Sequence, residues 1–449
     1  MKLLFISLGC DKNLSDSEEM LGLLREKGYT FTDDEQEAEV IIVNSCCFIN
    51  DAKEESIRTI LEMAQLKEYG NCKALIVTGC LSQRYQEEIY REIPEVDGIV
   101  GTSSYDQILE VIDGAMRKER PKMFLDRDRL VQVQSERVIT TGGYYAHLKI
   151  AEGCDKHCTY CIIPSIRGRY RSVPMERLLE QAKLLAKKGV KELILVAQET
   201  TLYGIDLYGE KKLHILLEEL CKIPELQMIR LLYCYPEEIY DGLIRTMKFE
   251  PKVCHYLDMP IQHCNDRILK RMGRRTNKAQ LYEIIEKLRR EIPDICLRTT
   301  LITGFPGETE EEFQELMEFI DEMEFDRLGA FAYSPEEDTS AAGFPEQVDE
   351  DVKAERLGEI MELQQEIAFD KSEDKIGCEM TAIVEGKVVD ENAYIARTYM
   401  DAPGIDGYVF INSEEALMTG DVVRVRITGT AEYDLIGELI SKSRGALPY

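Results

Sequence analysis

Apolar runs and helical segments alternate along the first 120 residues of the chain. Residues 2–8, 40–43 and 74–77 are short runs rich in leucine, isoleucine and valine, the pattern of strands that are buried on both faces of a sheet. A helical pattern covers about residues 51–66, and a capping box at Asp16-Ser17-Glu18-Glu19 predicts the start of a helix that Gly28 closes. Strands separated by helices predict a parallel α/β sandwich over residues 1–120.

The same alternation resumes after a polar interval. Residues 121–143 are charged and weakly periodic, which predicts a linker. Beyond it, a capping box at Thr309 opens one of several helical segments. Six strand-like runs lie between these segments, at residues 147–151, 192–197, 228–233, 254–259, 297–303 and 327–333. Six strands alternating with helices predict a partial (β/α)6 barrel over residues 144–350.

The last hundred residues change pattern twice. Residues 351–375 predict an amphipathic connecting helix, with an apolar stripe of Val352, Leu357, Ile360, Leu363 and Ile367. Residues 376–444 contain short alternating strands, separated by Gly and Asp turns, at residues 381–384, 408–411 and 422–427. This pattern predicts a small antiparallel β-barrel of about five strands. The whole chain is therefore predicted to be a multidomain α/β protein.

The net charge of −29 narrows the range of partners. Such an acidic surface repels phosphate backbones and attracts basic proteins. The N-terminus lacks a basic region followed by a signal-type apolar run, and no apolar run approaches the ~18 residues of a membrane span. We therefore expect a cytoplasmic protein without a membrane partner, whose 14 cysteines are metal ligands or buried side chains rather than disulfides.

Three cysteines form a C-x3-C-x2-C run directly after one of the apolar segments: Cys154, Cys158 and Cys161. Three thiolates at this spacing can hold three irons of a four-iron cluster and leave the fourth iron open. A structural zinc site and a redox dithiol are the alternatives, but zinc normally takes four ligands and a redox motif needs only two cysteines. The spacing therefore favours an iron–sulfur cluster with one reactive iron.

Three further cysteines each follow one of the first three predicted strands: Cys10, Cys46 and Cys80. The carboxyl ends of parallel strands lie at one edge of a sheet, where ligands usually bind, so these thiols are expected to converge. Three buried cysteines in loops are the alternative. Their equivalent positions favour a second three-cysteine iron–sulfur site.

The order of these motifs resembles that of the methylthiotransferases of the radical S-adenosylmethionine superfamily. The matching segments are the run from Cys154 to Cys161, Leu8-Gly9-Cys10-Asp11-Lys12-Asn13, Asn44-Ser45-Cys46, Thr78-Gly79-Cys80 and Gly304-Phe305-Pro306-Gly307-Glu308. The resemblance implies a transferase with two 4Fe-4S clusters, in which S-adenosylmethionine is both the methyl donor and the source of a 5′-deoxyadenosyl radical. It also implies that residues 144–350 are the radical-SAM core and residues 376–444 a substrate-recognition barrel of the TRAM type.

The resemblance further implies which cysteines hold each cluster. The radical-generating cluster would be held by Cys154, Cys158 and Cys161. The auxiliary cluster would be held by Cys10, Cys46 and Cys80, so that all six cysteines are expected to be both metal ligands and catalytic. Cys47 stands where the family more often has a small residue, which leaves Cys46 and Cys47 as alternative ligands, and the flanking Asn44-Ser45 favours Cys46.

Cofactor contacts are expected at three other positions. Tyr160, inside the cluster loop, would pack near the adenine, and Glu199 and Arg298 lie at or beside predicted strands on the expected face of the barrel. A buried ring or a salt bridge is the alternative for each of them.

The substrate is expected to be a ribosomal protein. Residues 197–204 and 401–407 resemble the branch that modifies the β-carbon of an aspartate in small-subunit ribosomal protein S-twelve, giving 3-methylthioaspartate. Residues 378–442 hold 12 acidic and 5 basic side chains, a net charge of −7, which suits a basic protein. A reducing electron donor protein would be a further partner.

Two other functions compete with this one. The sister branch modifies isopentenyl-adenosine in tRNA, but a barrel that binds tRNA should be basic. A non-catalytic iron–sulfur electron carrier would have no use for two open irons.

Overall fold

The computed structural model describes residues 1–133, 135–389 and 391–442, and the chain folds as two compact units. The first unit comprises Met1–Thr140, Ala151–Val173 and Ser334–Ala342. The second comprises Thr141–Ile150, Pro174–Tyr333 and Gly343–Tyr449. Each unit contains a six-stranded parallel sheet, so the predicted multidomain α/β class is confirmed.

The sheet of the first unit has the strand order β2-β1-β3-β4-β5-β6, with all neighbours parallel. Its strands are β1 (Lys2–Ser7), β2 (Thr30–Phe31), β3 (Val40–Ser45), β4 (Ala74–Gly79), β5 (Gly98–Val100) and β6 (Lys122–Met123). Every residue of β3 and β4 is buried, which explains why these strands appear in the sequence as continuous apolar runs.

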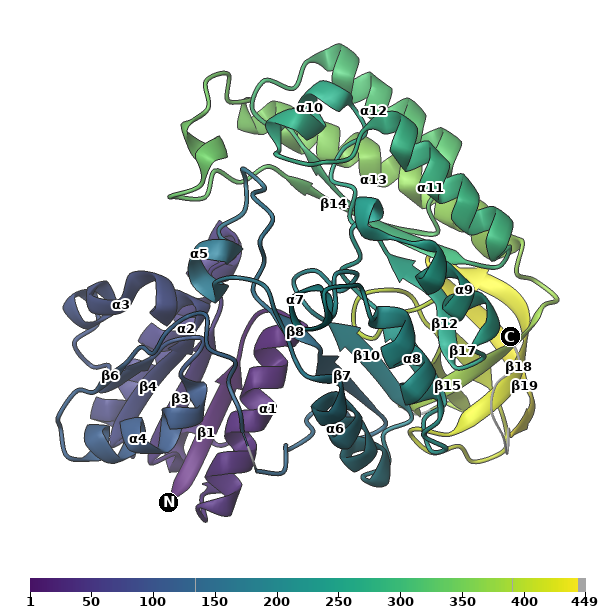
Figure 1. Ribbon diagram of the computed structural model, residues 1–449. Coiled ribbons are helices and arrows are strands. Elements are labelled where there is room, and N and C mark those ends of the chain that lie inside the picture. Colours follow the sequence, from purple (N-terminus) through teal and green to yellow (C-terminus); the bar gives the residue numbers. More distant parts are fainter. Residues whose placement is uncertain (134, 390, 443–449) are drawn as a thin grey trace. The chain divides into compact units, whose positions relative to one another are not determined.

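Helices cover both faces of this sheet (Figure 1). They are α1 (Asp11–Glu26), α2 (Asn50–Tyr69), α3 (Cys80–Glu92) and α4 (Ile108–Met116). Ile41 and Val43 of β3 pack in one core with α2 and α3, whereas the alternate residues Val40 and Ile42 pack in another with α1 and α4. Successive strand residues point to opposite faces, so one strand supplies both cores. The predicted sandwich is confirmed.

The start of α1 was predicted six residues too late. The helix begins at Asp11, with Cys10 in the N-cap position, and no capping box forms at Asp16. Asp16 and Glu18 are buried inside the helix, because their carboxylates bind arginines instead of free helix amides. Gly28 does follow the end of the helix, with a left-handed φ of +89°.

The segment predicted as a linker packs against the first unit. It supplies the edge strand β6, and Arg129 within it forms a bidentate ion pair with Asp106. Arg137 pairs with Glu18 of α1.

The sheet of the second unit has the order β14-β13-β12-β11-β10-β7, again fully parallel. All six predicted strands are present, as β7 (Tyr145–Lys149), β10 (Glu192–Val196), β11 (Met228–Leu231), β12 (Val253–Asp258), β13 (Cys296–Thr303) and β14 (Arg327–Ala332). The helices between them are α6 (Met175–Lys187), α7 (Ile205–Tyr208), α8 (Leu213–Cys221), α9 (Asp241–Phe249), α10 (Asp266–Arg271), α11 (Lys278–Glu291) and α12 (Glu310–Met323). The Thr309 capping box on α12 forms as predicted. The sheet is open, which confirms the partial barrel.

The apolar stripe predicted for the helix after this sheet is incomplete. In α13 (Glu350–Glu373), Ile360 and Ile367 are buried, but so are Lys353, Arg356 and Gln364. The buried polar groups have partners, since Arg356 binds Glu308 at 2.8 Å and Gln364 donates to the Phe325 carbonyl at 2.9 Å. Paired polar side chains therefore take places that the pattern assigned to Val352, Leu357 and Leu363.

The C-terminal part of the second unit is a closed five-stranded barrel, as predicted. Its strands are β15 (Glu379–Lys387), β16 (Ala393–Thr398), β17 (Val409–Asn412), β18 (Val422–Ala431) and β19 (Asp434–Lys442). The pair β17–β19 is parallel and the other pairs are antiparallel, because a ring with an odd number of strands cannot alternate direction throughout. Residues 443 and 444, the predicted end of the barrel, lie outside the described residues.

Among the described helices, none combines the length and the apolar composition that crossing a membrane requires.

Candidate functional site

Three cysteines follow three neighbouring strands of the first unit. Cys10 comes after β1, Cys46 after β3 and Cys80 after β4, and β3 lies between β1 and β4 in the sheet. Cys10 is exposed, and Cys46 and Cys80 are buried. Cys10 is the N-cap of α1 and Cys80 is the first residue of α3, so both lie at the N-terminal end of a helix.

Two motif glycines allow these loops to approach one another. Gly9 has a φ of +88°, and a Cβ there would lie 2.9 Å from the Cys46 sulfur. Gly79 has a φ of +92°, and its Cβ would lie 2.4 Å from both the Asn44 side-chain oxygen and the Ser45 carbonyl. Both positions need a residue without a side chain, for conformation and for space.

Asn13 and Ser56 hold the backbone of the same loops. The side-chain amide of Asn13 donates to the Leu8 carbonyl at 2.8 Å and to the Ser45 carbonyl at 3.1 Å. It therefore connects the loop after β1, the first loop, to the loop after β3, the second loop. The Ser56 hydroxyl accepts from the Cys46 amide at 2.9 Å and donates to the Cys46 carbonyl at 2.8 Å. These hydrogen bonds satisfy polar groups inside the protein and connect the loops to each other and to α2.

The thiols influence one another electrostatically. Burial raises the pKa of Cys46, and the neighbouring Cys10 raises it further. Burial also raises the pKa of Cys80, against the opposing charge of Arg167, whose Nη2 donates to the Cys80 sulfur at 3.7 Å. A bound cation would offset this cost, because a nearby positive charge stabilises thiolates.

Cys47 has different surroundings from Cys46. It is fully buried, and burial raises its pKa to about 12, with Arg84 opposing. Arg84 also donates weakly to its carbonyl, at 3.5 Å. Because Gly9 lies against the Cys46 sulfur, Cys46 is the member of the pair that faces the first loop.

The other three cysteines lie in the loop that follows the short strand β8 (Ala151–Glu152), which pairs with β9 (Arg171–Ser172). The Cys154 amide donates to the Gly168 carbonyl and the Cys161 amide to the Cys158 carbonyl, both at 3.1 Å, and these bonds shape the loop. Burial, followed by the charges of Cys158 and Cys154, raises the pKa of Cys161 to about 12. The charges of the other two thiols therefore influence Cys161.

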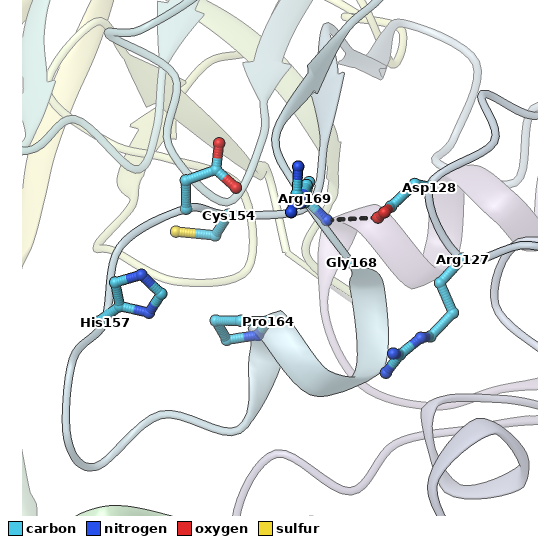
Figure 2. A pocket seen from close by; sticks show the side chains of 8 residues that line it. Arg127, Asp128, Cys154, His157, Pro164, Gly168 and Arg169 are labelled. Atoms are coloured by element: carbon cyan, nitrogen blue, oxygen red, sulfur yellow. Dashed lines mark hydrogen bonds between the residues drawn. The ribbon is translucent and has the colours of Figure 1, made fainter.

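A pocket of about 590 Å³ opens beside Cys154 (Figure 2). Figure 2 shows Cys154, His157 and Pro164 around one side of this space and Arg127, Asp128 and Arg169 around the other. The Arg169 amide donates to Asp128 at 2.8 Å, which fixes that wall. The lining is polar and charged, and it is completed by Asp155 and Gly168.

Among the described residues, no three His, Cys, Asp or Glu side chains gather round a point where a single metal ion could bind. A four-iron cluster makes no such demand, because its cysteines bind separate irons.

The three expected cofactor contacts lie in different settings. Tyr160 is part of the cluster loop in the first unit. In the second unit, Glu199 is fully buried and accepts from the Thr201 amide at 3.0 Å. Arg298 pairs with Asp258 at 3.0 Å and with Asp406 at 3.3 Å, so its charge is balanced inside its own unit.

No role was assigned from the sequence to two buried charged side chains. One is Arg167, which bonds Asp16, Asn13 and the Cys80 sulfur. The other is Glu308 of the glycine-containing turn, which accepts from the Gly304 amide at 3.0 Å. Motif spacing could not reveal the ion pairs of Arg167 with Asp16 and of Glu308 with Arg356, because these partners lie far apart in the chain.

Comparisons with known proteins agree with this arrangement. Residues 2–101 match the family described as uncharacterized protein family UPF0004, residues 148–320 the radical SAM superfamily, and residues 376–440 the TRAM domain. Among solved structures, the radical S-adenosylmethionine methyltransferase TsrM from Kitasatospora setae aligns with a TM-score of 0.56 at 12% identity, over 87% of this chain and 79% of that one. The fold and the matched families define a radical-SAM protein with a C-terminal TRAM barrel.

Curated relatives narrow this class. The ribosomal protein uS12 methylthiotransferase RimO of Lachnoclostridium phytofermentans is 62% identical over 437 residues, which cover 97% of this chain and 99% of the relative. The protein of the same name from Geobacter sulfurreducens is 51% identical over 442 residues, 98% of this chain and 99% of the relative. The chain belongs to the RimO family.

Proposed function

We propose that this protein transfers a methylthio group to the β-carbon of an aspartate in ribosomal protein uS12, giving 3-methylthioaspartate. The observation that carries the proposal is the full-length identity of 62% to a relative named as a uS12 methylthiotransferase. The net charge of −7 over residues 378–442 supports a basic protein substrate over tRNA. A ribosomal substrate supports a reaction in the cytoplasm.

The six cysteines are proposed as ligands of two 4Fe-4S clusters. Cys154, Cys158 and Cys161 would hold the radical-generating cluster, and Cys10, Cys46 and Cys80 the auxiliary one. When bound, these clusters and S-adenosylmethionine would supply a reductively generated radical that can abstract hydrogen from an aliphatic C–H bond, and the sulfur that replaces that hydrogen.

The protein's own groups prepare the two sites. Cys10 and Cys80 lie at the N-terminal ends of α1 and α3. Asn13 and Ser56 fix the backbone on either side of the auxiliary set, so the ligands need little reordering to bind iron. We further propose Tyr160, Glu199 and Arg298 as contacts for S-adenosylmethionine.

The domains divide these tasks. We propose residues 1–120 for the auxiliary cluster, residues 121–143 as the connection to the core, residues 144–350 for radical generation, residues 351–375 as a connecting helix, and residues 376–444 for recognition of uS12. A reducing protein would deliver the electrons.

The test uses anaerobically reconstituted protein with S-adenosylmethionine and dithionite. Purified uS12 and total tRNA are offered in parallel, and mass spectrometry follows the methylthio group while chromatography follows 5′-deoxyadenosine. We expect uS12 alone to gain the group. Modified tRNA beside unmodified uS12 would contradict the proposed substrate, and the absence of 5′-deoxyadenosine in every reaction would contradict radical chemistry.

A further inference from the structure

We propose that Arg167 is a positioning residue that raises the reduction potential of the auxiliary cluster through its contact with Cys80. This inference rests on the ligand assignment proposed above. It gives a defined role to a residue that follows the cysteine loop of the other cluster.

Arg167 reaches the auxiliary site from an anchored helix. It is the last residue of α5 (Ile163–Arg167), which begins two positions after Cys161 and lies beside α3 (Figure 1). Ile162 and Ile166 are buried in the same core as Leu81 of α3. Apolar packing therefore holds α5 against the sheet and brings its final side chain to the strand ends.

The guanidinium is almost completely buried, at 2% exposure. Its Nη2 donates to the Asn13 side-chain oxygen at 2.8 Å and to the Cys80 sulfur at 3.7 Å. Its Nη1 donates to Asp16 at 2.7 Å and to Glu152 at 3.2 Å. All these partners lie in the first unit. Four hydrogen-bond partners thus hold the guanidinium in place, and one of its N–H groups points at the Cys80 sulfur.

A hydrogen bond to a ligand sulfur stabilises the electron-rich reduced state of an iron–sulfur cluster, and so does a nearby positive charge. Burial strengthens both effects, since little water screens them. Asp16 and Glu152 offset part of the charge, but neither is bonded to the Cys80 sulfur. Loss of the guanidinium should therefore make the cluster harder to reduce.

A purely architectural role is the competing interpretation. Arg167 would then only fasten α5 to α1 through its pair with Asp16. Its removal would lower the stability of the protein but leave the potential of a cluster that still binds unchanged. Measuring the reduction potential of the auxiliary cluster therefore distinguishes the two interpretations, whereas measuring enzyme activity alone does not.

The experiment isolates the auxiliary cluster in a full-length background carrying Cys154→Ala, Cys158→Ala and Cys161→Ala. Asp16→Asn is compared with Asp16→Asn/Arg167→Gln, because this pair leaves one buried carboxylate, that of Glu152, rather than two without the Arg167 cation. Arg129→Gln removes an arginine of the same unit that pairs with Asp106, and serves as the control for lost charge. Iron is counted, and the reduced fraction is followed by EPR during a redox titration.

We expect the reduced-to-oxidised ratio at a fixed potential to fall about tenfold when Arg167 is removed from the Asp16→Asn protein, which equals 59 mV for a one-electron couple. Arg129→Gln should leave it unchanged. Equal potentials with and without Arg167 would overturn the proposal while leaving the ligand assignment intact. If the background protein binds no cluster at all, the ligand assignment fails and the proposal fails with it.

Should the double variant lose its iron, Arg167→Lys carries the test. A single ammonium keeps a positive charge for Asp16 but cannot also reach Asn13, Glu152 and the Cys80 sulfur. The ratio should fall in the same direction by a smaller factor, and an unchanged ratio would overturn the proposal.

Discussion

Glu192 of β10 and Arg397 of β16 form a buried ion pair, with Oε2 and Nη2 2.8 Å apart. Arg230 of β11 binds the other carboxylate oxygen, also at 2.8 Å, and it donates to the Thr398 carbonyl at 3.2 Å and the Tyr399 carbonyl at 2.6 Å. Two strands of the six-stranded sheet and one strand of the barrel thus meet on a single carboxylate. Within the second unit, this cluster fastens the barrel to the sheet.

Glu192→Gln is expected to destabilise the second unit by about 3–5 kcal/mol. The change leaves the guanidiniums of Arg230 and Arg397 buried beside a neutral amide, and an uncompensated buried charge is costly. Urea unfolding of the whole protein should show the loss as a shift of one transition to lower denaturant.

Glu379→Gln is the matched control. Glu379 also binds two arginines, Arg424 at 3.3 Å and Arg426 at 2.9 Å, but it lies on the surface of the barrel. Water screens such pairs, so the transition should barely move. Equal losses in the two variants would contradict the importance of burial here.

The Glu192 carboxylate should also make the free energy of unfolding depend on pH in the acid range. Burial pushes the pKa of Glu192 up, but the charges of Arg397 and Arg230 outweigh it and lower the pKa from 4.5 to about 2. A carboxyl group with a lowered pKa in the folded state stabilises the protein fully above its unfolded pKa, and this contribution is lost as the pH falls through the folded value. The difference in unfolding free energy between wild type and Glu192→Gln should therefore shrink from pH 4.5 toward pH 2. Apoprotein is used, to avoid acid-labile clusters.

The buried strands could be predicted from the sequence because burial on both faces leaves a continuous apolar signal. The observed β10 (Glu192–Val196) and β12 (Val253–Asp258) lie within one residue of their predictions at each end. The three cysteines after strands could be found for the same reason. Each strand end is visible, and parallel strands must end at one edge.

The pattern of hydrophobic and polar residues could not show which polar groups are buried. Asp16 resembles a helix cap in sequence, but in the structure it is the partner of Arg167, 151 residues away. Lys353 and Arg356 look like the solvent face of a helix, although both are buried. Such groups depend on partners that are distant in the chain, and hydrophobic periodicity contains no information about them.

Gly9→Ala is expected to lower the iron bound at the auxiliary site. The added Cβ would lie 2.7 Å from the Cys46 Cβ and 2.9 Å from its sulfur, so the first or second loop must move. Iron and sulfide per chain after reconstitution measure the effect. The Cys154 set should keep its cluster, and 5′-deoxyadenosine should still form.

Gly28→Ala separates the clash from the backbone strain. Gly28 has nearly the same φ, +89°, but its Cβ would meet no atom within 4 Å. Both substitutions carry a left-handed penalty of about 1 kcal/mol, and only Gly9→Ala adds the collision. Iron loss in both variants would show that strain alone is responsible.

Cys46→Ala and Cys47→Ala should differ sharply. The Cys46 variant is expected to lose about half of the bound iron, since one of two clusters loses a ligand. It should stop methylthio transfer to uS12 but retain cleavage of S-adenosylmethionine. Cys47→Ala should keep its iron and both activities. The reverse pattern would make Cys47 the ligand, and loss of cleavage in both would contradict the division of labour between the cysteine sets.

The acidic barrel is expected to speed the encounter with a basic substrate. Glu391 and Glu414 are exposed on the barrel, and the double change Glu391→Lys/Glu414→Lys should reduce the association rate with uS12 by roughly tenfold at low salt. The difference should shrink as salt is added, because the screening length falls from about 30 Å at 0.01 M to about 8 Å at 0.15 M. Glu283→Lys/Glu286→Lys makes the same change in net charge on exposed positions of α11, outside the barrel. Stopped-flow fluorescence at both salt concentrations measures the association rates. If only the barrel variant is slower, the substrate first meets the barrel. If both double variants slow association equally, the total charge of the protein rather than the barrel attracts the substrate.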